Sequence, residues 1–100
     1  MKKIVVFGGS GFLGSHVADA LSKCSYDVHI FDKEASEYLL PGQNMIIGDI
    51  QNERDIDKAV KVAHYVYHFA AIADILEAQQ NLIETVAVNV LSTVKILQSC

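Results

Sequence analysis

The glycine-rich segment near the amino terminus restricts the fold of this chain more than any other feature. A predicted strand, Lys3–Phe7, which is apolar from Ile4 onward, leads directly into Gly8, Gly11 and Gly14, which recur at every third position. A buried strand, a tight glycine turn and the start of a helix, in that order, can bind a diphosphate. The free N–H groups and the dipole of the first helical turn would then face the negative charge.

Each of the three glycines has its own role in this prediction. Gly8 lets the chain turn sharply out of the strand, Gly11 omits a Cβ where the backbone approaches the phosphates, and Gly14 allows close helix packing. The helix that follows is expected to face the sheet with an apolar stripe. That stripe is formed by Val17, Leu21 and Cys24, with Ala20 beside them.

A second apolar run, Val28–Phe31, ends in Asp32. This acid follows the glycines at about the 20-residue separation at which such folds place the carboxylate for the adenosine ribose hydroxyls. A carboxylate accepts two hydroxyls and repels a 2′-phosphate, so the sequence favours NAD over NADP. Lys33, the next residue, partly offsets that repulsion. The alternative interpretation is an ordinary turn followed by a surface Asp.

The rest of the sequence continues the alternation of strands and helices. We expect strands at Met45–Ile47 and Tyr65–Ala71, and helical spacing from Ala78 to Gln98. Asn52 is expected to cap a helix. The apolar stripe of that helix is Ile56, Ala59, Val60 and Ala63. This order predicts an α/β fold with a doubly wound parallel sheet, strand order 3-2-1-4, in three α/β/α layers. The glycine turn, Asp32, Asp49 and Ala70-Ala71 would then meet at one rim.

Bulk properties exclude several classes of function. The 100 residues suffice for one small domain, and the net charge of −4 without a basic cluster argues against a nucleic-acid partner. No apolar run is long enough for a membrane span or a signal peptide. Two scattered cysteines, Cys24 and Cys100, indicate reduced thiols and a cytoplasmic protein. The four histidines lack metal-ligand spacing, so no metal site is expected, and His68 is interpreted as a buried, hydrogen-bonded residue.

Several motifs in order resemble the extended short-chain dehydrogenase/reductases, the NAD-dependent epimerase/dehydratase enzymes that act on nucleotide sugars. The resemblance covers essentially the whole chain, and the nearest subgroup is similar to UDP-glucose 4-epimerases. The motifs are Gly8–Gly14, Asp32, Gly48-Asp49-Ile50, His68-Phe69-Ala70-Ala71 and Asn89-Val90-Leu91-Ser92-Thr93. Ser92 replaces a family glycine, and Leu82 stands where proline is frequent; both positions bear on helix packing. The resemblance implies a Rossmann-type fold with NAD as cofactor.

The resemblance also implies a role for each matching position. Backbone around Ser10–Leu13 would meet the pyrophosphate, and Asp32 with Lys33 the ribose. Asp49 and Ile50 would flank the adenine, while Phe69, Ala70 and Ala71 would pass beneath the nicotinamide ribose. Judged on the residues alone, Asp49 could instead form a turn or helix cap, and Ala70-Ala71 could simply pack in a strand. The cofactor residues expected from this sequence are Gly8, Ser10, Gly11, Phe12, Leu13, Gly14, Asp32, Lys33, Asp49, Ile50, Phe69, Ala70 and Ala71.

The catalytic pair of this family, a tyrosine with a lysine four positions later, has no match here. None of Tyr26, Tyr38, Tyr65 and Tyr67 has such a lysine, and in family order the pair would follow Cys100. We therefore expect residues 1–100 to be the cofactor-binding, N-terminal part of a longer nucleotide-sugar enzyme, without turnover of their own. A non-catalytic NAD sensor of the same fold is the alternative, and the presence of Tyr-x-x-x-Lys downstream would discriminate. The apolar stripe Leu82–Leu97 is either core or the face of a two-fold homodimer.

Overall fold

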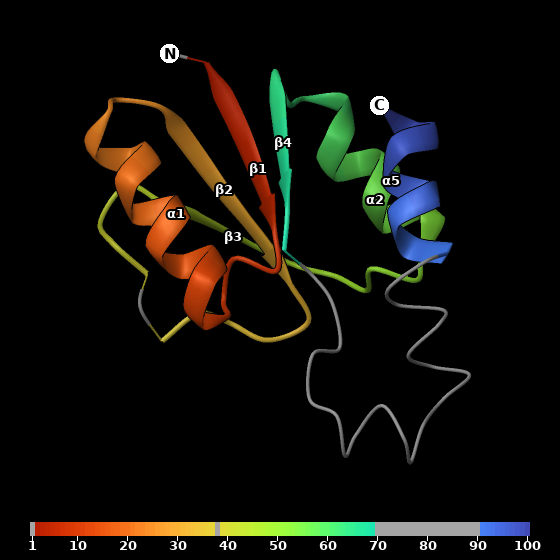
Figure 1. The fold of residues 1–100 in the computed structure, drawn as a ribbon, viewed down its shortest axis with the longest axis horizontal. Helices are drawn as coiled ribbons and strands as arrows, with labels where there is room; N and C mark the ends of the chain where they lie inside the picture. Colours follow the sequence, from red (N-terminus) through yellow and green to blue (C-terminus); the bar gives the residue numbers. More distant parts are fainter. Residues whose placement is uncertain (1, 38, 70–90) are drawn as a thin grey trace.

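The described strands of this chain form a parallel sheet in which the first strand lies in the interior, with later strands on both sides of it. The computed structural model describes residues 2–37, 39–69 and 91–100. Strands β1 (Lys3–Phe7), β2 (Asp27–Asp32), β3 (Asn44–Ile47) and β4 (Tyr65–His68) pair in the order β3-β2-β1-β4 (Figure 1). All three pairings are parallel. The predicted α/β class and the strand order are confirmed.

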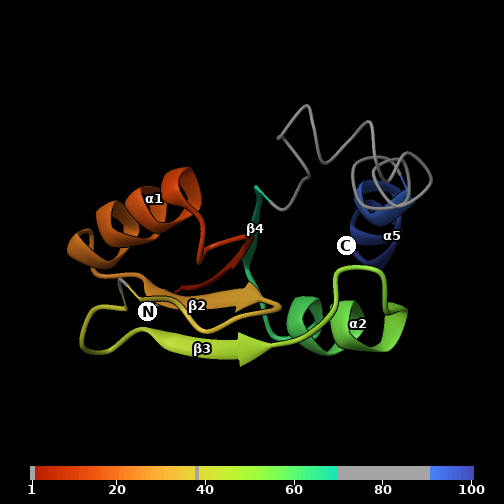
Figure 2. The same cartoon turned by 90° about the horizontal axis from the view of Figure 1, so that it is seen from below.

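The helices cover opposite faces of the sheet. Helix α1 (Phe12–Lys23) lies on one side, and α2 (Glu53–Lys61) with α5 (Ser92–Ser99) on the other (Figure 2). Successive strand residues point to opposite faces. In β1, Ile4 and Val6 therefore pack in the core cluster beneath α1, while Val5 and Phe7 pack in the cluster with α2 and α5. Burial on both faces explains why β1 is apolar without interruption from Ile4 to Phe7.

The buried face of α1 agrees only in part with the predicted stripe, of which Leu21 packs against the core cluster and Val17 is half-buried. Its buried residues are Gly14, Ser15 and Ala18, whereas Ala20 is exposed and Cys24 is an exposed residue beyond the last helical turn. The reason is the short distance between α1 and the glycine turn. A Cβ placed on Gly14 would lie 2.3 Å from the carbonyl oxygen of Gly8, so only small residues fit the facing side of the helix.

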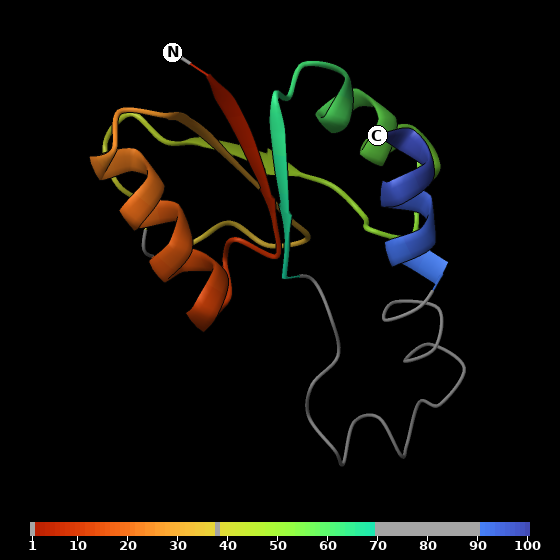
Figure 3. The ribbon, with the colours of Figure 1, turned by 45° about the horizontal axis from the view of Figure 1, so that its top comes forward.

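Helix α2 begins where the sequence predicted. The Asn52 side-chain oxygen accepts the N–H groups of Arg54 and Asp55 at 2.9 and 3.2 Å, which satisfies two free donors of the first turn. Ile56 and Ala59 are buried, and the two other predicted stripe residues of α2 pack beside them. Figure 3 shows α5 alongside α2.

Only the last part of the apolar stripe Leu82–Leu97 can be compared with the structure, because residues 70–90 lie outside the described ranges. Val94 and Leu97 on α5 are 52% and 71% exposed, and Ile96 supplies the buried contact of this helix. These two stripe residues are therefore not core residues within the described part of the chain. Strand β4 is also shorter than expected, since it ends at His68.

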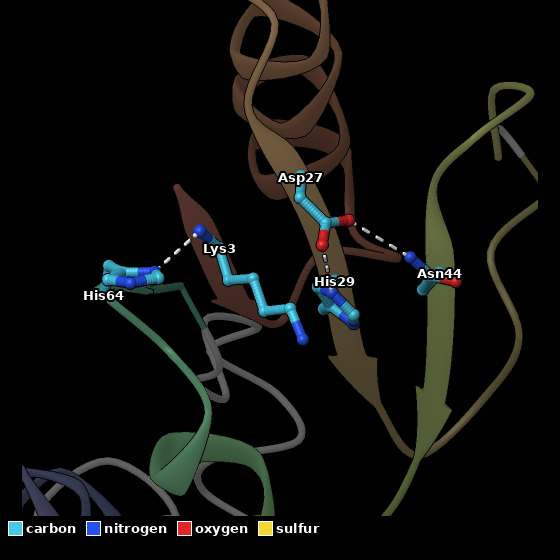
Figure 4. Close-up of polar contacts among 5 residues, drawn as sticks. All are labelled: Lys3, Asp27, His29, Asn44 and His64. Carbon is cyan, nitrogen blue, oxygen red and sulfur yellow. Dashed lines mark hydrogen bonds and ion pairs between the residues drawn. The ribbon is translucent and has the colours of Figure 1, made fainter. Parts of the chain in front are cut away.

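Two separate sets of polar contacts lie at the amino ends of the strands (Figure 4). The Lys3 backbone N–H donates to Nδ1 of His64 at 2.9 Å. The Asp27 carboxylate accepts from Nδ2 of Asn44 at 3.3 Å, and its other oxygen lies 3.2 Å from Nε2 of His29. Two of these contacts join neighbouring segments of the sheet, Lys3 with the residue before β4 and Asp27 of β2 with Asn44 of β3, while the contact with His29 lies within β2. None of the helices in the described ranges is long and apolar enough to cross a membrane.

Candidate cofactor-binding site

The turn between β1 and α1 has the backbone geometry that its glycines predicted. Gly8 has a φ of 80°, in the left-handed region that favours glycine, and its N–H continues the sheet by donating to the Phe31 carbonyl at 2.8 Å. The Gly11 N–H then donates to the Gly8 carbonyl at 3.2 Å, which closes the turn. A Cβ on Gly11 would meet nothing closer than Gly8 O at 3.4 Å, an ordinary contact. Packing therefore does not require glycine at position 11, and its absent side chain leaves the outer face of the turn open.

Gly9 is a further requirement of this turn that the sequence analysis missed. A Cβ there would lie 2.6 Å from Cγ2 of Ile30, a side chain buried in the sheet. The pair of consecutive glycines at positions 8 and 9 was the available signal.

The amino terminus of α1 has backbone donors available for an anion. Gly11 occupies the N-cap position, and within the described residues no side chain caps the helix. The first turn carries no acidic residue that would compete for its N–H groups. The helix dipole adds a partial positive charge at the same place. Because no side chain occupies these N–H groups, the amino end of α1 can bind a phosphate.

Asp32 is oriented by two backbone donors, one from each side of the site. Its Oδ2 accepts the Ser10 N–H at 3.1 Å, and its Oδ1 accepts the Lys33 N–H at 2.8 Å. The carboxylate is thereby held next to the glycine turn at the carboxyl end of β2. Each oxygen keeps further acceptor capacity, since an ionised carboxylate has about four lone-pair sites.

A surface cleft of about 370 Å³ lies between the glycine turn and the segment after β2. Five residues expected from the sequence line it, namely Ser10, Gly11, Phe12, Asp32 and Lys33. Glu34, Ala35 and Glu37 complete the lining, and the sequence analysis singled out none of these three. The fold thus brings the predicted pyrophosphate and ribose residues together in one cavity.

The segment after β3 is ordered by the side chain that was expected to meet adenine. Oδ1 of Asp49 accepts the Gln51 N–H at 2.8 Å, which is a local turn, and the Asp49 N–H donates to Oδ2 of Asp55 at 3.0 Å. The turn-forming alternative is therefore present in the structure. Asp49 is exposed and Ile50 packs against the core cluster on the α2 face, and neither lines the cleft.

The end of β4 is only partly described. The Phe69 N–H donates to the Phe7 carbonyl at 2.7 Å, and the ring packs against the core cluster beneath α1. Ala70 and Ala71 lie outside the described residues. Phe69 is thus placed at the same edge of the sheet as the glycine turn, one residue past the strand.

His68 joins β4 to α5. Its Nε2 lies 2.9 Å from Oγ1 of Thr93, and its ring is edge-on to that of Phe7 with centroids 6.4 Å apart. Partial burial lowers the pKa of His68 from its ordinary value of 6.5, because desolvation disfavours the charged ring. The hydrogen bond expected for His68 is present, but the residue is half-buried and not buried as predicted. Among the described residues no group of three or more metal-ligating side chains is close enough to hold a metal ion.

The fold and the turn geometry place this chain among Rossmann-type α/β domains. Residues 4–100 match the model of the family described as "NAD dependent epimerase/dehydratase family". The chain therefore belongs to the NAD-dependent epimerase/dehydratase family, whose cofactor is NAD.

Individual relatives agree with this assignment. Over 100 residues the chain is 33% identical to a putative UDP-glucose 4-epimerase of Methanocaldococcus jannaschii, covering 95% of this chain and 32% of the relative. Over 70 residues it is 39% identical to mouse sterol-4-alpha-carboxylate 3-dehydrogenase, decarboxylating, covering 70% of this chain and 19% of the relative. The crystal structure of Thermus thermophilus UDP-glucose 4-epimerase with NAD superposes with a TM-score of 0.88 at 25% identity, covering 98% of this chain and 33% of that one. The chain thus spans between a fifth and a third of the length of these relatives.

Proposed function

We propose that residues 1–100 form the NAD-binding part of an enzyme that oxidises or epimerises a sugar carbon of a nucleotide sugar. The observation that carries this proposal is the contact between the Ser10 N–H and Asp32, which joins the glycine turn and the acid in one cleft. The pyrophosphate would lie on the amino end of α1, and the adenosine ribose diol would bind Asp32. NAD, when bound, supplies the hydride acceptor.

The residues of this chain would bind and orient that cofactor. The open outer face at Gly11 admits the phosphates, and the fixed Asp32 carboxylate selects two hydroxyls. Asp49 is exposed beside the same edge, and its second carboxylate oxygen is proposed to accept the adenine amino group, with Ile50 beside the ring. Phe69 with Ala70 and Ala71 is proposed to border the nicotinamide ribose. In this assignment a catalytic tyrosine and lysine would come from outside the 100 residues.

Calorimetric titration of the complete protein with NAD and NADP tests the cofactor assignment. We expect NAD to bind more tightly than NADP, and Asp32→Ala to weaken NAD far more than NADP. Asp27→Ala is a matched control, because it removes a carboxylate from the other end of the same strand. Tighter binding of NADP than NAD by the unmodified protein would refute the assignment.

A sterol substrate is the second candidate, favoured by the 39% identity to the mouse sterol dehydrogenase. The two candidates share the cofactor site and differ in the substrate region. Incubation of the complete protein with NAD and either UDP-glucose or a 3β-hydroxysterol 4-carboxylate distinguishes them. Conversion of UDP-glucose to its C4 epimer supports the first candidate, while NADH formation with the sterol acid alone would replace it with the second. For residues 1–100 alone we expect dinucleotide binding and no turnover.

A further inference from the structure

The segment that follows Asp32 is tied across the cleft by a serine side chain. Oγ of Ser10 donates to the Glu34 backbone carbonyl at 2.8 Å, while the Ser10 N–H donates to Asp32. Ser10 therefore holds the chain on both sides of Lys33. Lys33, Glu34, Ala35 and Glu37 form one wall of the cleft, and this wall is anchored at the Glu34 carbonyl.

This wall is acidic. Glu34 and Glu37 line the same cavity as Asp32, and both are exposed to solvent. Lys33 is the only basic residue among those that line it. Three carboxylates against one ammonium leave a net negative charge at the mouth of the cleft, where Asp32 would hold the ribose hydroxyls.

We propose that Glu34 and Glu37 are specificity-determining residues that exclude a phosphorylated ribose, and that the Ser10 side chain is a positioning residue that holds them in place. The proposal rests on the proposed NAD site and adds to it the residues that reject the competing dinucleotide. A 2′-phosphate brings nearly two further negative charges to the ribose. The carboxylates of Glu34 and Glu37 would repel those charges, whereas an unphosphorylated ribose would not experience this repulsion.

The proposed role of Glu34 and Glu37 differs from that of Asp32 in how each acts on the ribose. Asp32 contacts the hydroxyls directly, whereas Glu34 and Glu37 act through space and are therefore sensitive to salt. The ratio of the NADP to the NAD dissociation constant isolates their effect, because the pyrophosphate charge is common to both dinucleotides. A mutation that merely damages the fold would weaken both ligands together.

The test compares four forms of the complete protein by calorimetry with NAD and NADP at low and high salt. These are the unmodified protein, Glu34→Gln/Glu37→Gln, Ser10→Ala, and the control Glu53→Gln/Asp57→Asn. The control removes the same two charges from α2, away from the cleft, and keeps an acceptor for the Ser99 hydroxyl that bonds Asp57. We expect the first double variant to reduce the preference for NAD by about tenfold, mainly by tighter NADP binding. High salt should reduce the preference of the unmodified protein more than that of the variant.

Ser10→Ala should reduce the preference for NAD by a smaller factor, about threefold. In this variant Glu34 and Glu37 keep their charges, but the hydrogen bond from the Ser10 hydroxyl to the Glu34 carbonyl is lost. A preference that stays within twofold in the Glu34→Gln/Glu37→Gln variant would overturn the proposal. An equal change in the α2 control would also overturn it, because the effect would then follow net charge alone. If the unmodified protein binds neither dinucleotide, the proposed function fails. If it binds NAD but the ratio of the NADP to the NAD dissociation constant does not change in the Glu34→Gln/Glu37→Gln variant, only the role proposed for Glu34 and Glu37 fails.

Discussion

The two ends of the sheet use the same kinds of residue in opposite ways. At the amino ends, one oxygen of Asp27 accepts from the Asn44 side chain on β3, and the other lies 3.2 Å from Nε2 of His29 on its own strand, so both oxygens face polar groups of the protein (Figure 4). At the carboxyl ends, Asp32 accepts two backbone N–H groups, with no side-chain donor among the described residues, and borders an open cleft. Both acids lie on β2, only five residues apart. The difference indicates that one end stabilises the sheet and the other remains available for a ligand.

The largest loss of stability is expected at the carboxyl ends of the strands, where α1 packs directly against the backbone of the glycine turn. Gly14→Ala places a Cβ 2.3 Å from Gly8 O and 3.0 Å from Gly9 Cα, and these backbone atoms cannot move aside as a flexible side chain could. We expect a loss of about 3 kcal/mol in the free energy of unfolding, measured by urea denaturation. Gly11→Ala is the control, with an expected loss below about 1 kcal/mol, because its Cβ would make an ordinary contact. Equal losses in the two variants would contradict the packing role assigned to Gly14.

The contrast between the two acids of β2 is tested by removing each in turn. Asp32→Ala should weaken NAD by about 10- to 100-fold, because two ribose hydroxyls lose a charged acceptor. Asp27→Ala should leave the NAD dissociation constant unchanged and lower stability by about 1 kcal/mol. Calorimetry with NAD and urea unfolding measure the two quantities on the same preparations. A large loss of NAD affinity in Asp27→Ala would remove the distinction between the two ends.

The polar contacts at the amino ends of the strands are expected to affect the stability of the fold but not dinucleotide binding. His64→Ala removes the acceptor for the Lys3 N–H, a bond between the chain before β4 and the first residue of β1. We expect about 1 kcal/mol less stability and no change in dinucleotide affinity, measured by urea unfolding and by titration. His64→Asn is the more conservative variant, since its side-chain oxygen can accept the same proton. Weaker NAD binding in His64→Ala would show that the two ends are coupled through β1.

The sequence predicted the parts of this molecule that depend on local patterns. The strand at Lys3–Phe7, the turn at Gly8 and the cap at Asn52 each follow from neighbouring residues, and the structure confirms them. The buried face of α1 was predicted only in part: Leu21 packs against the core, but the burial of Gly14 was missed because apolar spacing does not reveal how close a helix lies to a turn. The tie between Ser10 and Glu34 was also beyond prediction, since it depends on the path of residues 33–37 across the cleft.

The last prediction concerns the histidine at the carboxyl end of β4. The pKa of His68 is below 6.5 in the folded chain, so the unfolded chain binds its proton more readily. The stability that His68 contributes is therefore complete above about pH 6.5 and is lost as the pH falls through the lowered folded value. Urea unfolding of the complete protein should show less stability near pH 5 than near pH 7.5, and the decrease should be smaller in His68→Gln. His16→Gln, which removes an exposed ring from α1, is the control and should keep the full pH dependence. An identical pH dependence in His68→Gln and in the unmodified protein would mean that other groups cause it.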